Sequence, residues 1–576
     1  MKFFHVYNDD CLEGLEKNGL INRDTGFKLQ HCFAIPPQRL FNAYAAKGTK
    51  LHHLIRSERI PFYVDRLAGG ISWYPYNFDE SLIREYRDLL GDWFLGFQLH
   101  ESASNFRGNW NSVRDLGLGN GPYDPEVLDQ AFLSDYAVTP EGKRLHNLSQ
   151  AGVRYFALRK YPETYEEFLQ YYRDLLLRRT MDTDGNVLPC DSAYLATGMQ
   201  DEMGMRTFMP EVGQQTPLMR VAVALARGMA RAKKKTWGTY YECWRASDEY
   251  GYTMPCFNTE PANEWYLTQE SHPDDFTSYG PHGGSSRLLQ NRIYYYSLMA
   301  GADYLSEEWG LNCSYNDMKS FELSDYGLVK KNFIHNALRF RGMQAETPFA
   351  LVLPKRYAVC EINHILAHPM GERRGRYIGY PLSDADTECF GHIEDLIKLF
   401  FSYTEHASWD SEDHVLTNSR FGDVFDILYE DASDEALSRY DTLIDASPDG
   451  AFAKAKAHTA LRIWESGDLS ALELALRKRI QEILPCTADA LHWLVSTDEK
   501  GKRYLSVFHN AGNERDIRKG DILHSEADRT VTVCFREEVS PEVVAQGTNG
   551  SVSLSRRDGF TYHLTVPAAS FAILSF

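Results

Sequence analysis

The sequence predicts an α/β protein with three parts: a (β/α)8 barrel of the TIM type over residues 1–343, an open α/β domain over 344–485, and a small antiparallel β-sandwich over 486–576. Two observations point to the barrel. Short apolar stretches alternate with helix signals eight times before residue 343, which is typical of a parallel sheet. Four of these stretches end in a carboxylate, and only a closed barrel brings all of those ends around one opening. A doubly wound open sheet is the alternative.

The acidic composition limits the possible partners. The formal net charge is −19, and no basic run exceeds Lys233–Lys235, so we expect neither nucleic acid nor an anionic membrane surface to bind. No apolar run is long enough to span a bilayer, and the first ten residues are too short and too acidic for a signal peptide. The ten cysteines include no Cys-x-x-Cys pair. We therefore expect reduced thiols in a cytoplasmic protein.

The barrel strands are expected where aromatic and β-branched residues gather in short runs. These runs cover residues 3–7, 27–35, 60–66, 94–101, 192–197, 207–211, 235–244 and 301–309. Between them, Asp9 and Asp10 can cap a first helix, and Pro36-Pro37 can open a second, because a missing N–H does no harm in a first turn. Apolar residues at helical spacing predict the later helices, which cover 79–90, 161–179, 218–233, 288–300 and 328–340.

Two long segments interrupt this alternation. Residues 102–140 are rich in Asn, Gly and Pro and follow the fourth strand, and residues 247–284 follow the seventh. Long segments of this kind in a compact domain are usually binding loops. We expect the first of them to shape a cleft.

The pattern changes after about residue 349. Apolar strands at 349–354, 425–429 and 442–445 alternate with helices at 392–403 and 432–440, which predicts an open parallel sheet of the flavodoxin or amidotransferase kind. It has no Gly-rich phosphate loop, so no nucleotide is expected. After a helix at 470–484, short strands follow one another in alternating pattern, which is typical of an antiparallel β-domain. They cover 504–509, 529–535, 551–554, 562–566 and 570–576.

The strongest candidate for chemistry is Glu242, which ends the seventh strand among aromatic residues. Glycosidic bond cleavage needs two carboxyl groups, and aromatic side chains offer flat faces to a sugar ring. Glu101, Glu211 and Glu307 lie at the ends of the fourth, sixth and eighth strands. Any of them could supply the second carboxyl group. The alternative for Glu242 itself is an ion pair with an Arg at a strand end.

Two local patterns resemble a known family. The first is Gly91-Asp-Trp-Phe-Leu-Gly-Phe-Gln-Leu-His-Glu101. The second is the strand ending in Glu242, followed by Gly280-Pro-His-Gly-Gly284, a helix and Gly301-Ala-Asp303. Together with the domain order, they are similar to the three-domain β-galactosidases of glycoside hydrolase family 42, within the clan of retaining barrel glycosidases.

The resemblance implies roles for single residues. Glu101 would be the acid/base, Glu242 the nucleophile and Trp309 a platform under the sugar. His100 stands where the clan has an Asn that contacts the sugar 2-OH, and His100 could donate a similar hydrogen bond. The resemblance also implies a homo-oligomer, since the family forms trimers.

Further substrate-binding residues are expected around these carboxylates. They are His100, Arg66, Glu211, Tyr241, Trp244, His282, Glu307 and Trp309. Glu307 and its neighbour Glu308 are expected to divide into one cleft residue and one structural residue. No His-x-His or His-Glu-x-x-His spacing occurs, so neither a metal nor another cofactor is expected.

The sequence therefore predicts a retaining exo-glycoside hydrolase that acts on a small β-glycoside or oligosaccharide, similar to a β-galactoside. Two alternatives remain open. One is a glycosidase for a different sugar, such as a glucoside, arabinoside, fucoside or glucuronide. The other is a barrel that binds carbohydrate without catalysis.

Overall fold

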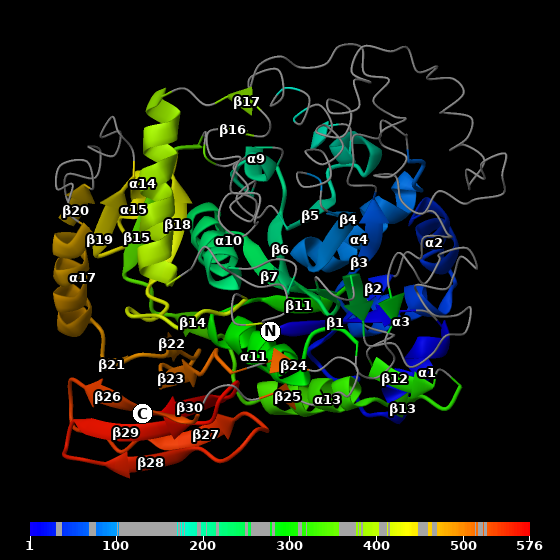
Figure 1. Ribbon diagram of the computed structural model, residues 1–576. Helices are drawn as coiled ribbons and strands as arrows, with labels where there is room; N and C mark the ends of the chain where they lie inside the picture. Colours follow the sequence, from blue (N-terminus) through cyan, green and yellow to red (C-terminus); the bar gives the residue numbers. More distant parts are fainter. Residues whose placement is uncertain are drawn as a thin grey trace.

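Figure 1 shows the computed structural model of the 576-residue chain. The structure describes residues 1–7, 9–29, 37–67, 76–100, 102, 170, 173, 176–177, 179–192, 197–202, 204–214, 218–247, 251–254, 277–278, 283–308, 314–317, 319–355, 357, 376–377, 380–381, 384–402, 412, 415–446, 459–462, 469–512, 514–515, 522–523 and 527–576. None of the helices in this part of the chain is long and apolar enough to cross a bilayer.

The first part of the chain forms a closed barrel of eight parallel strands, as the alternating pattern predicts. The strands follow one another around the barrel in the order β1-β11-β7-β6-β5-β4-β3-β2. Their bounds are β1 Lys2–Tyr7, β2 Thr25–Leu29, β3 Phe62–Leu67, β4 Phe94–His100, β5 Val187–Asp191, β6 Thr207–Gly213, β7 Thr236–Glu242 and β11 Tyr304–Glu307.

Helices surround the barrel close to their expected positions. They are α1 Asp9–Lys17, α2 Pro37–Tyr44, α3 Lys50–Glu58, α4 Glu80–Leu90, α10 Met219–Lys233, α11 Arg287–Met299 and α13 Asp325–Ala337. Asp79 caps α4 by accepting from the backbone N–H of Ser81 at 2.9 Å. The helix predicted at 161–179 lies mostly outside the described residues.

The fifth strand is the one barrel strand that the sequence placed wrongly. It covers Val187–Asp191, not 192–197, and α9 (Thr197–Glu202) begins where that strand was expected to end. Pro189 lies inside β5, and a Pro usually counts against a central strand because it cannot donate to the hydrogen-bond ladder. The segment 247–284 also differs from a simple loop: its described parts contribute to a small sheet of β8 (Arg245–Ser247), β9 (Gly251–Met254) and β10 (Thr277–Ser278).

Aromatic side chains fill the inside of the barrel. Phe4, Tyr63, Tyr240 and Tyr304 pack there with Leu95, Leu188, Cys190 and Met209. Hydrogen bonds satisfy buried tyrosine hydroxyl groups there: Tyr63 Oη lies 2.7 Å from Ser306 Oγ, and Tyr304 Oη lies 2.7 Å from Thr207 Oγ1. The barrel is therefore a packed core below its mouth, and side chains on the same strand faces nearer the carboxyl ends point into that mouth.

The second part is a four-stranded parallel sheet with the order β18-β15-β19-β20. Its strands are β18 Phe425–Tyr429, β15 Phe349–Leu353, β19 Thr442–Asp445 and β20 Thr459–Arg462, and α14 (Asp384–Phe401) packs against it. The barrel helix α10 also contacts this sheet along β18. A Cβ on Gly228 of α10 would lie 2.4 Å from the carbonyl oxygen of Ile427, so only Gly permits this close approach.

A buried ionic cluster joins α10 to the second sheet. Arg227 Nε donates to Asp426 Oδ1 at 2.6 Å, and its Nη1 lies 3.3 Å from Asp423 Oδ2. Arg231 and Tyr440 both donate to Asp426 Oδ2, at 2.7 and 2.8 Å. Burial alone would raise the pKa of Asp426, but Arg231 and Arg227 hold it below its ordinary value.

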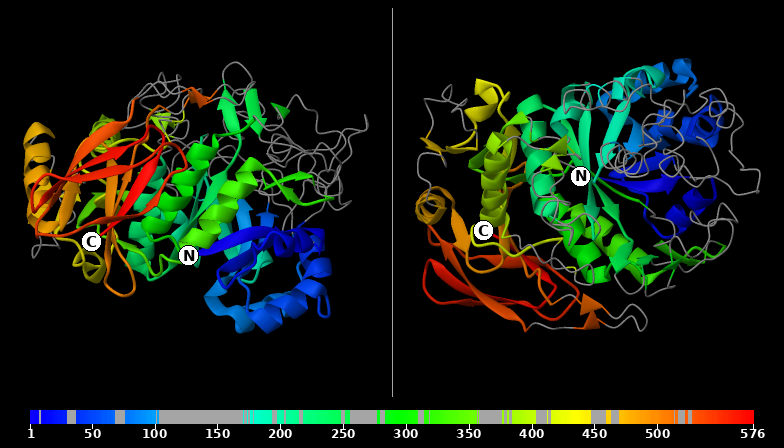
Figure 2. Two further views of the ribbon diagram at one scale, coloured as in Figure 1. Left: turned by 90° about the horizontal axis from the view of Figure 1, so that it is seen from below. Right: turned by 45° about the horizontal axis from the view of Figure 1, so that its top comes forward.

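The third part is built mainly of two antiparallel sheets, together with a two-stranded antiparallel sheet of β24 (Glu514–Arg515) and β25 (Ile522–Leu523). The five-stranded sheet has the order β14-β22-β23-β30-β27, and the four-stranded sheet has the order β21-β26-β29-β28. Their strands are β14 Gln344–Ala345, β22 His492–Thr497, β23 Arg503–Phe508, β30 Phe571–Ser575, β27 Glu542–Gln546, β21 Cys486–Ala488, β26 Arg529–Phe535, β29 Thr561–Val566 and β28 Ser553–Arg556. Figure 2 shows these sheets, in orange and red, on the same side of the barrel as the second domain.

Candidate active site

The mouth of the barrel is lined by polar side chains from seven consecutive positions around it. Successive side chains of a strand point to opposite faces, and Phe4, Tyr63 and Tyr240 point into the barrel. The inward side chains that follow on each strand, toward its carboxyl end, therefore line the mouth. These residues are Lys28 of β2, Asp65 of β3, His100 of β4, Cys190 of β5, Glu211 of β6, Glu242 of β7 and Glu308, which comes directly after β11. The C-terminal face is where barrel enzymes carry their catalytic groups.

Three carboxylates meet at this mouth. Glu211, Glu242 and Glu308 each place an oxygen within 4.8 Å of the others. All three are buried, with 1%, 0% and 6% of their surface exposed. Burying several like charges together is unfavourable unless protons or counter-charges compensate, and pairs of this kind are typical of acid/base sites.

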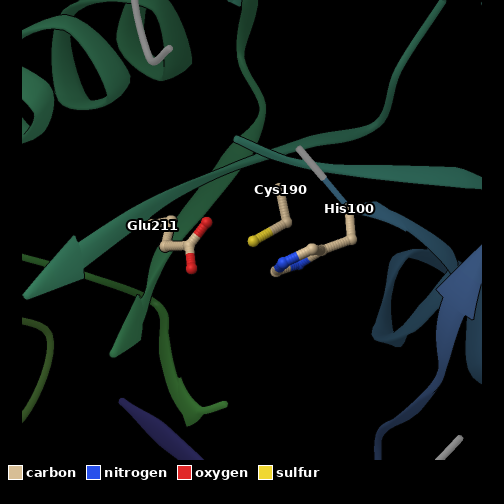
Figure 3. Close-up of side chains that lie close together, drawn as sticks. All are labelled: His100, Cys190 and Glu211. Atoms are coloured by element: carbon tan, nitrogen blue, oxygen red, sulfur yellow. The ribbon is translucent and has the colours of Figure 1, made fainter. Parts of the chain in front are cut away.

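His100 approaches these carboxylates from the opposite side of the mouth. Its Nε2 lies 3.6 Å from Glu308 Oε1, and its ring meets the Tyr240 ring edge-on at 5.7 Å between centroids. Figure 3 shows that its ring, the Cys190 thiol and the Glu211 carboxylate point toward one another from β4, β5 and β6. One donor atom from each of these three residues lies within 4.8 Å of the other two.

Lys28 supplies a buried positive charge at the mouth. Its Nζ lies 3.6 Å from Asp65 Oδ2 and 5.5 Å from the centre of the Tyr240 ring. It also donates to the carbonyl oxygens of Glu307 and Glu308, at 2.9 and 2.6 Å. Lys28 therefore fixes the backbone from which the Glu308 side chain projects, and it offsets part of the negative charge of the mouth.

Glu307, the last residue of β11, and Glu308, which follows it, point in opposite directions. Glu307 points away from the barrel axis, where it accepts from Tyr294 of α11 and pairs with Lys330 of α13. Tyr241 also points outward, toward Ser285 and Tyr294. The structure therefore does not bring Glu307 and Tyr241 into the mouth, because strand neighbours face opposite sides. Glu308 takes the inward place, and Trp244 Nε1 donates to its Oε2 at 2.7 Å.

Several predicted site residues cannot be placed. Glu101, His282 and Trp309 lie outside the described residues, and so does the side chain of Arg66. Their roles stay predictions. The structure adds Lys28 and Cys190, which the sequence did not single out as site residues. Lys28 could have been found from the sequence, because a lysine between Phe27 and Leu29 in an apolar strand is unusual and suggests a functional role. Cys190 had no such signal beyond its place at a strand end.

Gly213 gives the Glu242 side chain its space. The two residues are paired across β6 and β7, and a Cβ on Gly213 would lie 2.0 Å from Glu242 Cγ and 2.6 Å from its carbonyl oxygen. We expect Gly213→Ala to displace the carboxylate and to lower kcat by about 100-fold, the effect of a misplacement of about 1 Å. The loss of stability should be about 1–3 kcal/mol.

Steady-state kinetics with any substrate that a panel of glycosides identifies would measure this effect. Gly391→Ala is the matched control, because Gly391 lies in α14 with no described atom within 4 Å of the added Cβ. That variant should keep the wild-type kcat. Equal kcat values for both variants would show that Gly213 does not position Glu242.

No protein-family model matches the chain, and no curated protein matches it. Among solved structures, the chain is similar to the catalytic module of a family 98 glycoside hydrolase from Streptococcus pneumoniae TIGR4 (TM-score 0.40, 9% identity, 100% of this chain and 98% of that chain). It is also similar to α-L-fucosidase isoenzyme 2 from Paenibacillus thiaminolyticus (0.41, 10%, 99% and 96%). A third similar structure is Gan42B, a GH42 β-galactosidase (0.44, 7%, 100% and 98%). All three similar structures are glycoside hydrolases, and each is 10% or less identical in sequence to this chain.

Proposed function

We propose that the protein is a retaining glycoside hydrolase that cleaves a small β-glycoside by double displacement. The observation that carries this proposal is the group of buried carboxylates at the barrel mouth. Retaining enzymes hold their two carboxyl groups about 5–5.5 Å apart, whereas inverting enzymes need about 6.5–9.5 Å to admit a water molecule. One oxygen each of Glu211, Glu242 and Glu308 lies within 4.8 Å of the others, so a pairing of Glu242 with Glu211 or Glu308 would be close enough for the retaining mechanism and too close for the inverting one.

Glu242 is the nucleophile in this proposal. It ends β7 inside the barrel, and its side chain is held between Gly213 and its neighbouring carboxylates. Its carboxylate attacks the anomeric carbon as the glycosidic bond breaks, and a protonated carboxyl group gives its proton to the leaving oxygen. That group then takes a proton from the water that hydrolyses the glycosyl-enzyme.

The resemblance at the fourth strand supports Glu101 as the acid/base. Glu211 is the alternative, because its oxygen lies within 4.8 Å of the Glu242 oxygen. The two assignments differ in a measurable way. Loss of the acid/base slows substrates with poor leaving groups much more than aryl glycosides with activated leaving groups, since the latter need little protonation. The Glu101→Gln and Glu211→Gln variants should therefore separate in this comparison.

The sugar is proposed to be similar to a galactoside, and this rests on the resemblance of the strand ends to family 42. His100 lies within reach of the same mouth as the carboxylates, so it could donate to the sugar 2-OH. A glucoside, arabinoside, fucoside or glucuronide would fit the same carboxylate chemistry.

The experiment that tests the function is turnover of a panel of aryl β- and α-glycosides, followed by proton NMR of the first sugar released. The panel includes galactoside, glucoside, fucoside, arabinoside and glucuronide. We expect one β-glycoside to be cleaved and the β-anomer to form first. Release of the α-anomer first from a β-glycoside would exclude double displacement. Cleavage of an α-glycoside alone would overturn the proposed β-specificity, and no turnover across the panel would favour a carbohydrate-binding barrel.

A further inference from the structure

One group of side chains at the mouth includes a donor, the Cys190 thiol, that the glycosidase mechanism does not need. Cys190 of β5 lies between His100 of β4 and Glu211 of β6 in the strand order, and Figure 3 shows the three side chains converging. Each contributes a donor atom within 4.8 Å of the other two. Glycosidic bond cleavage by two carboxylates has no role for a thiol at this place.

We propose that His100, Cys190 and Glu211 bind one thiophilic divalent cation of the Zn²⁺ class. A thiolate, an imidazole and a carboxylate together suit Zn²⁺, whereas Mg²⁺ and Ca²⁺ prefer sites made only of oxygen donors. Three protein ligands with one position left open are the usual pattern of zinc sites that also bind a water or a small ligand.

The geometry needs only a small adjustment to hold the ion. Ligands about 2.0–2.3 Å from a tetrahedral zinc lie roughly 3.3–3.8 Å apart, and the three donors start within 4.8 Å. Rotations of the His100 and Glu211 side chains can close that difference, because both project from strand ends into the mouth. Glu211 also lies within 4.8 Å of Glu242 and Glu308, so either carboxylate could complete the coordination.

Gln98 provides an independent sign of a polar site at this place. It is fully buried on the inward face of β4, two residues before His100, and its Nε2 lies 3.7 Å from Sδ of Met209, two residues before Glu211. The side chain therefore crosses from β4 to β6 beneath Cys190. Its buried Oε1 has no hydrogen-bond partner among the described residues, and a ligand held above it could provide one, either directly or through a bound water.

The ion and the sugar would compete for the same mouth. A bound cation would engage His100 and Glu211 and lie beside Glu242. It should therefore inhibit glycoside cleavage, and a chelator should restore that activity. This consequence rests on the proposed function, but the binding site does not.

The test uses Co²⁺ as a spectroscopic probe on the full-length, reduced chain after dialysis against a chelator. We expect one equivalent of Co²⁺ to give the thiolate-to-cobalt charge-transfer absorption and the visible bands of a tetrahedral site, and Zn²⁺ to remove both. Cys190→Ser should abolish the charge-transfer band. His100→Ala and Glu211→Gln should weaken binding by more than about 10–100-fold, the cost of losing only an outer-shell partner.

Cys486→Ser is the matched control, because Cys486 is equally buried but belongs to the C-terminal sheets. It should keep the wild-type spectrum, and circular dichroism should show all variants folded. Wild-type protein without a charge-transfer band would overturn the proposal, and so would a band that survives in Cys190→Ser. Failure of the glycosidase proposal would instead appear as an inactive glycoside panel with the cobalt spectrum intact.

Discussion

Replacing Glu242 with Ala is expected to lower kcat on the best glycoside by about 10⁴-fold or more, the scale on which loss of a nucleophile acts in covalent mechanisms. Without this carboxylate, the anomeric carbon has no covalent partner, and the two-step route is closed. Azide fits the space left by the side chain and can attack in its place. We expect azide to restore turnover and to give a glycosyl azide of inverted configuration, which NMR would identify.

Glu307→Gln is the control for this experiment. Its carboxylate points away from the mouth toward Tyr294 and Lys330, so the variant should lose stability while its folded fraction keeps the wild-type kcat. Activity that survives in Glu242→Ala would move the nucleophile to Glu211 or Glu308, the described carboxylates nearest to it.

Breaking the buried ionic cluster between the barrel and the second domain is expected to have the largest effect on stability. Arg227→Met removes the cation that faces Asp423 and Asp426, and both carboxylates stay buried. Loss of one partner of a buried pair costs about 3–5 kcal/mol, since it leaves an uncompensated charge. Thermal unfolding followed by circular dichroism and by tryptophan fluorescence would measure the change.

Arg231→Met offers a graded comparison. The Arg231 side chain is 22% exposed and also lies 2.7 Å from Asp426 Oδ2, so water can replace part of its contribution, and the loss should be smaller. If both arginine variants unfold at the same temperature as the wild type, the cluster does not stabilise the interface.

The same cluster predicts a pH dependence. The folded-state pKa of Asp426 lies below its ordinary value of 3.8, so the stability it contributes is fully present above that value and is lost as the pH falls through the folded pKa. The stability difference between wild type and Asp426→Asn should therefore stay constant from about pH 5 to 8, where Asp426 is ionised in both states. It should shrink below pH 3.8, and a difference that grows with acid would contradict this assignment.

Most of the barrel could be predicted because the spacing of apolar residues and the ends of strands can be recognised within short segments of the sequence. The exception was β5. Pro189 counted against a strand there because a Pro has no N–H to donate, yet β5 pairs with β4 in the structure. The small sheet of β8, β9 and β10 was missed because its strands are only two to four residues long, and because β10 begins at Thr277, far beyond the end of β9 at Met254.

The site was predictable only in part, for a related reason. A carboxylate at the end of a strand can be recognised from a single segment of the sequence, and Glu211 and Glu242 were found in this way. The expectation of no metal relied on ligands spaced along one segment. His100, Cys190 and Glu211 come from three strands, and barrel closure rather than spacing brings them together. The inward place of Glu308, instead of Glu307, depends on a strand register that the sequence leaves open by one residue.

Helix α10 makes the barrel dependent on the second domain. Every residue from Met219 to Ala230 is buried, and a helix that is buried all round needs neighbours on every side. A fragment ending at residue 343 would expose the face that now meets β18, including the guanidinium of Arg227. We expect such a fragment to aggregate on expression, so attempts to isolate a minimal catalytic unit should retain the second sheet.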